Sequence, residues 1–105
     1  MKQIIVPKNI KAQQALTYDN ATNEQLLVWE LTDEEYNHLN DLNVFEIIND
    51  KCNTLIDDYE DEEIAYSKLQ EIINIFDRNN DKLLNKFHQY ILEAINRKTS
   101  LHFYF

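Results

Sequence analysis

The side chains best suited to chemistry form one acidic run near the middle of the chain. Six carboxylates and one tyrosine fill seven consecutive positions, which are Asp57, Asp58, Tyr59, Glu60, Asp61, Glu62 and Glu63. Carboxylates act as general acids and bases, and they also pair with arginine and lysine side chains. A catalytic pair needs two carboxyl groups in different environments, one of them partly buried. A run this dense indicates a solvated ridge, so we expect a binding surface and no enzyme.

The negative charge of the chain is concentrated around this run. The formal net charge is −9, and residues 30–63 alone carry 13 acidic residues against one base, Lys51. The flanking segments are slightly basic, at +1 for residues 1–29 and +2 for residues 64–105. Solubility alone favours mixed signs, because like charges repel each other in a compact fold. The asymmetry therefore predicts a cationic partner.

A second acidic cluster and interleaved tyrosines extend the predicted surface. Tyrosine adds rigid contact area to a surface whose carboxylates bind Arg and Lys. The alternative is a solvated face whose acids favour helix starts through the helix dipole. We predict that the partner-binding residues are those of the run, Asp57, Asp58, Tyr59, Glu60, Asp61, Glu62 and Glu63, assisted by Asp33, Glu34 and Glu35.

The sequence lacks recognisable cofactor and metal motifs. It contains no glycine, which phosphate-binding loops and nucleophile elbows require for their tight backbone turns. Residues 77–81 resemble the start of a calcium loop, but Lys82 replaces the required glycine and His88 the final glutamate. Zinc sites show paired ligand spacing, which is not found among His38, Cys52, His88 and His102. We expect no cofactor and no metal.

Charge and composition also restrict the partner and the compartment. The net charge of −9 argues against direct binding of nucleic acid, which needs clustered Lys and Arg, and against an anionic membrane surface. The chain has no apolar run long enough for a membrane span. The apolar run before Pro7 and Lys8 is too short for the core of a signal peptide. A single cysteine, Cys52, excludes an intrachain disulfide and fits a reducing compartment. We therefore expect a cytoplasmic protein.

The N-terminal third predicts strands followed by a capped helix. Residues 3–6 form a β-branched run that ends at Pro7, which suits a terminal or edge strand. Residues 25–31 are predicted as a second strand, with a helix from Thr22 as the alternative. The sequence from Thr32 to Glu35 is a capping box and predicts a helix that ends near residues 40–43. Residues 8–23 carry no clear pattern.

Apolar spacings of three and four predict helices over the rest of the chain. One helix is expected over residues 44–59 with a break near Asn53, a second over 61–78, and a third from about 84 to 98. The residues that close the chain, 101–105, are predicted as a strand that pairs with an early strand. Because glycine is absent, asparagine should take the left-handed turn positions, namely Asn20, Asn40, Asn43, Asn79 and Asn80.

Together these elements predict a single domain over residues 1–105. At this length one core can bury roughly 65% of the unfolded surface. The expected fold class is α+β, mainly α, with three to four helices. A small sheet would be formed by the N-terminal strand or strands and the C-terminal strand.

Two segments resemble the small acidic immunity proteins of bacterial polymorphic toxin systems, including contact-dependent growth inhibition. They are residues 45–60 (FEIINDKCNTLIDDYE) and residues 94–105 (AINRKTSLHFYF). The likeness is one of general character and extends over the C-terminal two thirds of the chain. It implies that the partner is a toxin domain, often a nuclease with a basic active site, which the immunity protein binds and blocks in the producing cell.

The first hypothesis is thus a stoichiometric inhibitor that covers a basic toxin domain with the acidic surface. A second is a nucleic-acid mimic that occupies the DNA site of a DNA-binding protein. A structural interaction subunit and a small metal-free hydrolase are the remaining alternatives. The sequence leaves the identity of the partner and the oligomeric state open.

Overall fold

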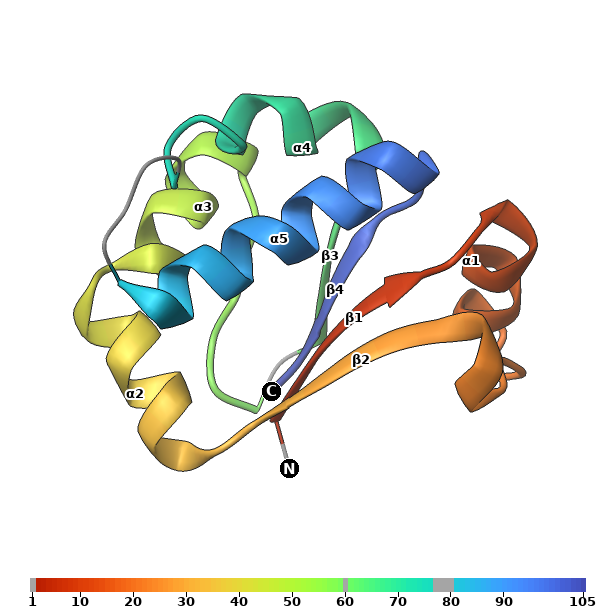
Figure 1. Ribbon diagram of the computed structural model, residues 1–105, viewed down its shortest axis with the longest axis horizontal. Helices are drawn as coiled ribbons and strands as arrows, with labels where there is room; N and C mark the ends of the chain where they lie inside the picture. Colours follow the sequence, from red (N-terminus) through yellow and green to blue (C-terminus); the bar gives the residue numbers. More distant parts are fainter. Residues whose placement is uncertain (1, 60, 77–80) are drawn as a thin grey trace.

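The structure of the chain, a computed structural model, describes residues 2–59, 61–76 and 81–105 (Figure 1). Within these ranges the elements follow one another as β1 (Lys2–Pro7), α1 (Ile10–Thr17), the 3₁₀ turn η1 (Asn23–Gln25), β2 (Leu26–Leu31), α2 (Asp33–Asp41), α3 (Val44–Cys52), β3 (Asp61–Ile64), α4 (Tyr66–Ile72), α5 (Lys82–Arg97) and β4 (Leu101–Tyr104). The chain therefore alternates short strands with helices.

The four strands form one antiparallel sheet in the order β2-β1-β4-β3. The C-terminal strand β4 lies between β1 and β3, and it pairs with β1 as the sequence predicted. Strand β1 is central because its apolar run Ile4–Val6 is buried, whereas the acidic β3 lies at one edge. Charged residues on an edge strand discourage further pairing with other chains.

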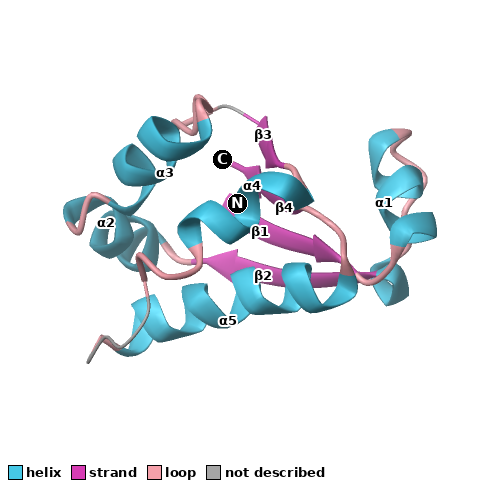
Figure 2. Cartoon of the chain, turned by 90° about the horizontal axis from the view of Figure 1, so that it is seen from above, coloured by secondary structure: helices cyan, strands magenta, loops and turns pink. Residues whose placement is uncertain are grey.

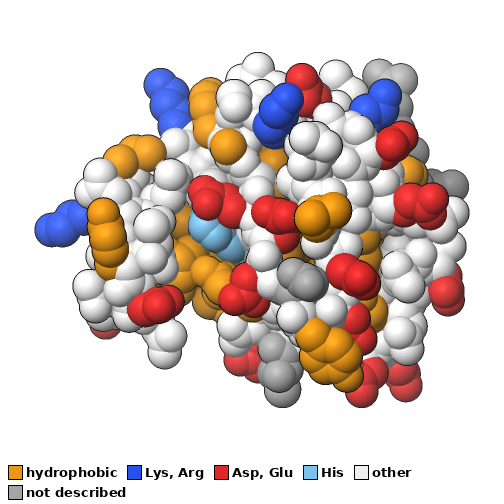
Figure 3. All heavy atoms as spheres, turned by 180° about the vertical axis from the view of Figure 1, so that it is seen from behind, with side chains coloured by type: hydrophobic (Ala, Val, Ile, Leu, Met, Phe, Trp, Pro, Cys, Tyr) orange, Lys and Arg blue, Asp and Glu red, His pale blue; other side chains and the backbone are white. Residues whose placement is uncertain are grey.

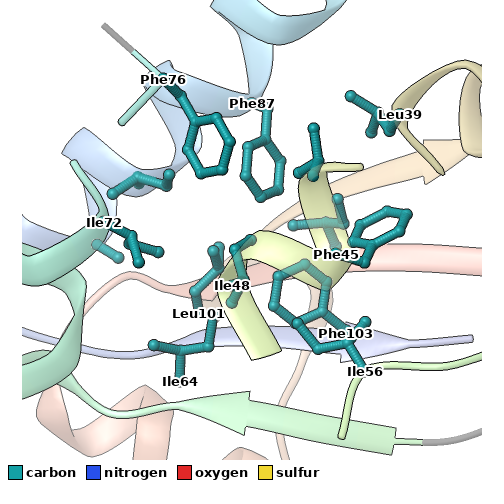
Figure 4. Close-up of a cluster of buried hydrophobic side chains, with 14 of the residues drawn as sticks. Leu39, Phe45, Ile48, Ile56, Ile64, Ile72, Phe76, Phe87, Leu101 and Phe103 are labelled. Carbon is teal, nitrogen blue, oxygen red and sulfur yellow. The ribbon is translucent and has the colours of Figure 1, made fainter. Parts of the chain in front are cut away.

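Helices α2 to α5 cover one face of the sheet, which we call the covered face (Figures 1 and 2). Alternate residues of a strand point to opposite faces, and the inward residues join one core with the helices. That core contains Ile4, Val6, Trp29, Leu31, Ile64, Leu101 and Phe103 from the strands. Figure 4 shows Phe45, Phe87 and Phe103 converging within it. Burial of these large aromatic side chains contributes much of the hydrophobic stabilisation of the fold.

The opposite face, which we call the open face, has a different composition. Ile5 and Ala12 are buried there, outside the main core, because α1 contacts β1. Figure 2 shows α1 set apart from the other four α-helices. His102 and Tyr104 of β4 alternate with the core residues Leu101 and Phe103, so they belong to the open face.

The predicted fold class is wrong in its helix count and in its sheet. The described residues contain five α-helices where three to four were expected, and the sheet has four strands. Helix α1 was missed because residues 10–17 bury a single side chain, Ala12, and so show little apolar periodicity. The side chain of Asn9 starts this helix by accepting the backbone N–H of Ala12 at 2.8 Å.

The helix predicted over residues 61–78 is also wrong at its start. Asp61–Ile64 is the edge strand β3, and helix α4 begins only at Tyr66. Three carboxylates in sequence suit a helix start, but pairing with β4 satisfies the backbone groups of this segment instead. The predicted break near Asn53 is confirmed: α3 ends at Cys52, where Asn53 adopts a left-handed conformation with φ 55°. The predicted helical continuation to residue 59 is wrong, since residues 54–59 are not helical.

Several local predictions are confirmed. Strand β2 covers residues 26–31, and the alternative of a helix from Thr22 is wrong apart from the short turn η1. The capping box is present, since Thr32 N–H donates to Glu35 Oε1 at 2.9 Å and Glu35 N–H donates to Thr32 Oγ1 at 3.1 Å. The stripe of Leu84, Phe87 and Ile91 is buried along α5.

The prediction for left-handed residues is right at one position. Positive φ angles occur at Asn43 as predicted, and also at Asp19, Asn53, Tyr59 and Lys98, but not at Asn20 or Asn40. Asn79 and Asn80 lie outside the described residues. In a chain without glycine, residues with a Cβ atom therefore take these positions, at a cost of roughly 1–2 kcal/mol each.

Candidate functional site

The sheet topology brings the two predicted acidic clusters to one end of the molecule. The register pairs Lys2 with Leu31 and Asp61 with Tyr104, so β1 and β3 begin where β2 and β4 end. Residues 32–35 leave the sheet at this end and residues 57–59 approach it there (Figure 1). We call this region the acidic end and define it by Asp33, Glu34, Glu35, Asp57, Asp58, Tyr59 and Asp61.

Lys2 links the two clusters within the acidic end. Its ammonium group forms an ion pair with Asp58 and lies over two tyrosine rings, 4.7 Å from the centroid of Tyr36 and 5.4 Å from that of Tyr59. The hydrogen bond to Asp58 raises the pKa of Lys2. Burial raises the pKa of Tyr36, and the negative charge of Asp58 adds to that increase. The carboxylates of residues 57–58 therefore lie close to helix α2.

The loop that carries Asp57 and Tyr59 is held by side chains from both of its neighbours. Asn49 of α3 accepts the backbone N–H of Ile56 at 2.7 Å and donates to its carbonyl oxygen at 3.0 Å. Glu62 of β3 accepts the backbone N–H of Leu55 at 2.9 Å. These bonds fix the loop while Ile56 is buried in the core, so the residues on either side of it are presented in a defined conformation.

Two large apolar side chains of this loop face solvent. The side chain of Tyr59 is 90% exposed and that of Leu55 is 77% exposed. Tyr59 also has a positive φ of 64°, a conformation that costs a residue with a Cβ atom roughly 1–2 kcal/mol. Exposed apolar groups that are held in place among charged ones are typical of contact surfaces.

The predicted run does not form one continuous ridge. Asp33, Glu34, Asp57 and Asp61 are exposed, whereas the carboxylate of Glu35 is used in the capping box. Strand alternation separates Glu62, which binds the loop, from Asp61 and Glu63, which lie on the open face. Glu60 lies outside the described residues.

A cleft opens between α1 and the edge of the sheet on the open face. Its volume is about 370 Å³, and it is lined by Leu16, Asp19, Asp61, Glu63, His102 and Tyr104, with Thr17 and Glu62 beside them. Figure 3 shows a hollow with a histidine at its floor and carboxylates around it. The sequence signal for this site was the alternation of His102 and Tyr104 with apolar residues, but the contribution of Asp19 depends on the unpredicted helix α1.

His102 is the buried polar centre of this cleft. The residue is 6% exposed, and its Nε2 lies 2.6 Å from Ser100 Oγ and 4.0 Å from Glu63 Oε1. Burial lowers the pKa of His102, and the charge of Glu63 opposes that decrease. The imidazole is therefore neutral at pH 7.

Ser100, His102 and Glu63 do not have the geometry of a catalytic triad. In a triad the carboxylate holds one imidazole nitrogen while the serine uses the other, whereas here both groups approach Nε2. Ser100 is also 1% exposed, so a substrate could not reach its hydroxyl group. The contact instead satisfies two buried polar groups.

Two of the residues weighed as metal ligands, His38 and Asp81, contact each other. Within the described part of the chain, no group of three or more His, Cys, Asp or Glu side chains could hold a metal ion. Of the calcium-like segment, residues 77–80 lie outside the described ranges. Asp81 is the N-cap of α5 and accepts the backbone N–H groups of Leu83 and Leu84. A 2.5 Å hydrogen bond with His38 is the main cause that lowers the pKa of Asp81.

No protein-family model, curated protein or solved structure matches this chain. None of the described helices has both the length and the apolar character that a bilayer crossing requires.

Proposed function

We propose that this chain is a binding protein that neutralises a cognate bacterial toxin by covering a basic toxin domain with its acidic end. The observation that carries the proposal is the convergence of the clusters at residues 33–35 and 57–59, which are separated in sequence by helix α3, around the exposed Tyr59. A protein gathers like charges at a cost to its own stability. A cationic partner would offset that cost.

The chemistry of the acidic end fits recognition of a basic protein surface. Asp57 and Asp61 are exposed and can accept charge-assisted hydrogen bonds from Arg and Lys. Tyr59 and Leu55 supply apolar contact area, and aromatic side chains are enriched among the residues that dominate binding energy. The acidic field would also steer a basic partner and speed its association.

The proposed place of action is the cytoplasm of the producing cell. Cys52 is buried on the inner side of α3, and a free cysteine is typical of a reducing compartment. In the cytoplasm the chain would bind the toxin domain, whether the toxin was made in the same cell or delivered by a neighbouring cell, and form a one-to-one complex.

The test uses the C-terminal domain encoded directly upstream of the gene for this chain. Cells that express this domain should stop growing, and co-expression of the chain should restore growth. The purified pair should form a 1:1 complex whose association rate falls by about 10-fold or more when salt is raised, because steering is screened. A chain that neither restores growth nor binds the domain would contradict the proposal.

A matched pair of triple variants locates the contact. Reversing three exposed acids at the acidic end (Asp33→Lys, Glu34→Lys, Asp57→Lys) should abolish protection and slow association. Reversing three exposed acids elsewhere (Glu24→Lys, Asp50→Lys, Glu71→Lys) changes the net charge equally and should preserve protection. Equal loss in both variants would mean that net charge matters and the acidic end does not.

A further inference from the structure

The cleft on the open face adjoins the acidic end and shares Asp61 with it. Its volume of about 370 Å³ far exceeds the roughly 10–15 Å³ that one water molecule needs. It is open to solvent, and the buried His102 is among the residues that line it. A side chain of a partner could therefore enter it.

Three carboxylates from two parts of the fold converge on this cleft. Asp19 follows α1 in a left-handed conformation (φ 57°), while Asp61 and Glu63 occupy alternate positions of β3. All three carboxylates act on the phenol of Tyr104. Burial raises the pKa of Tyr104, and the negative charges of Asp61, Asp19 and Glu63 add to the increase. Among the described residues that line the cleft, none is a lysine or an arginine. The cleft thus presents uncompensated negative charge.

The wall of the cleft is flat and aromatic. The rings of His102 and Tyr104 are nearly parallel, with an interplanar angle of 7° and centroids 6.3 Å apart. His102 contributes no positive charge while its imidazole is neutral. Planar guanidinium groups stack on aromatic rings and bind carboxylates through a rigid fork of N–H donors, whereas a lysine ammonium group does not.

From this geometry we infer that the cleft receives one arginine side chain of the protein partner, with Glu63 and Asp19 accepting its N–H groups and Tyr104 stacking on its plane. The inference rests on the proposed function, because it names a residue type that the toxin must present. A bound guanidinium group would also disfavour protonation of His102, which is faced by Glu63 and Asp61 from β3, Asp19 from the turn after α1 and Tyr104 from β4.

The test needs only the purified full chain and N-acetyl-arginine amide as the probe. Titration followed by NMR should give saturable shifts of the His102 and Tyr104 ring signals and a decrease in the pKa of His102. N-acetyl-citrulline amide, which is nearly isosteric but uncharged, should give no saturable shift. N-acetyl-lysine amide should bind at least about fivefold more weakly, because it lacks the planar fork.

Substitutions that remove the carboxylates sharpen this test. The double variant Asp19→Asn, Glu63→Gln should weaken binding of the arginine probe by about 10-fold or more. The matched control Glu24→Gln, Glu71→Gln should leave the affinity unchanged. Absence of saturable shifts, equal binding of the lysine probe, or unchanged affinity in the double variant would each overturn the inference.

The outcome is separable from that of the proposed function. If the arginine probe binds but the chain does not restore growth, the cleft stands and the toxin proposal fails. If growth is restored and lost again in the triple variant of the acidic end, while the probe does not bind, the toxin proposal stands and the arginine cleft fails.

Discussion

The covered face and the open face of the sheet are built from the same strands, but one packs into the main core and the other lines a cleft. On β4, Leu101 and Phe103 are buried in the main core, while the alternate residues His102 and Tyr104 line the cleft. On β3, Ile64 belongs to the core and Glu63 to the cleft. Strand alternation therefore separates the residues of the main core from those that line the cleft. Substitutions on one face should leave the properties of the other largely unchanged.

The largest effect is expected from comparing two adjacent residues of β4. Phe103→Ala removes a fully buried ring that contacts Phe45, Phe87 and Phe105, so the free energy of unfolding should fall by about 3–5 kcal/mol. Tyr104→Ala removes a half-buried ring from the open face and should cost about 1 kcal/mol. Urea unfolding of both variants measures the difference. Similar losses would mean that the open face also carries the stability of the fold.

The contrast between the two faces also explains why some helices could be predicted from the sequence and helix α1 could not. The capping box at Thr32 is a local hydrogen-bond pattern at an exposed helix start, and the apolar stripe of α5 packs into the main core. Helix α1 lies beside the open face, where it buries only Ala12 among its own residues. Its apolar periodicity is correspondingly weak, and the main signal for its start is the cap at Asn9.

The role of the acidic residues in binding stays a prediction, and their arrangement could not be predicted from the sequence. The fold brings residues 33–35 and 57–59 to one end, but the run does not form the single ridge that the concentrated charge suggested. The separation of Glu62 from Glu63 depends on pairing between β3 and β4, which are more than 35 residues apart in sequence. Non-local pairing of this kind overrides local propensity, so a helix start and an edge strand cannot be distinguished from three carboxylates alone.

A smaller effect is expected from the pH dependence of stability. Burial lowers the pKa of His102 in the folded chain, so between that value and the ordinary value near 6.5 the unfolded chain binds more protons. The free energy of unfolding should therefore decrease as pH falls through this range. The variant His102→Gln should show a weaker decrease between pH 7 and pH 5 in urea unfolding. An identical pH dependence in both proteins would mean that His102 is not buried as a neutral ring.

The smallest effect tests whether the open face responds to its own charges. The Glu63 carboxylate lies 4.0 Å from His102 Nε2 and favours the protonated imidazole. Glu63→Gln removes this charge and keeps the size of the side chain, so the pKa of His102 should fall further below its ordinary value. Titration of the His102 ring by NMR measures the shift, with Glu71→Gln on α4, which packs on the covered face, as the matched control. A pKa that rises in Glu63→Gln, or moves equally in the control, would mean that long-range charge and not the cleft sets the state of the imidazole. In that case the 4.0 Å contact with Glu63 would have no effect of its own on the protonation of His102.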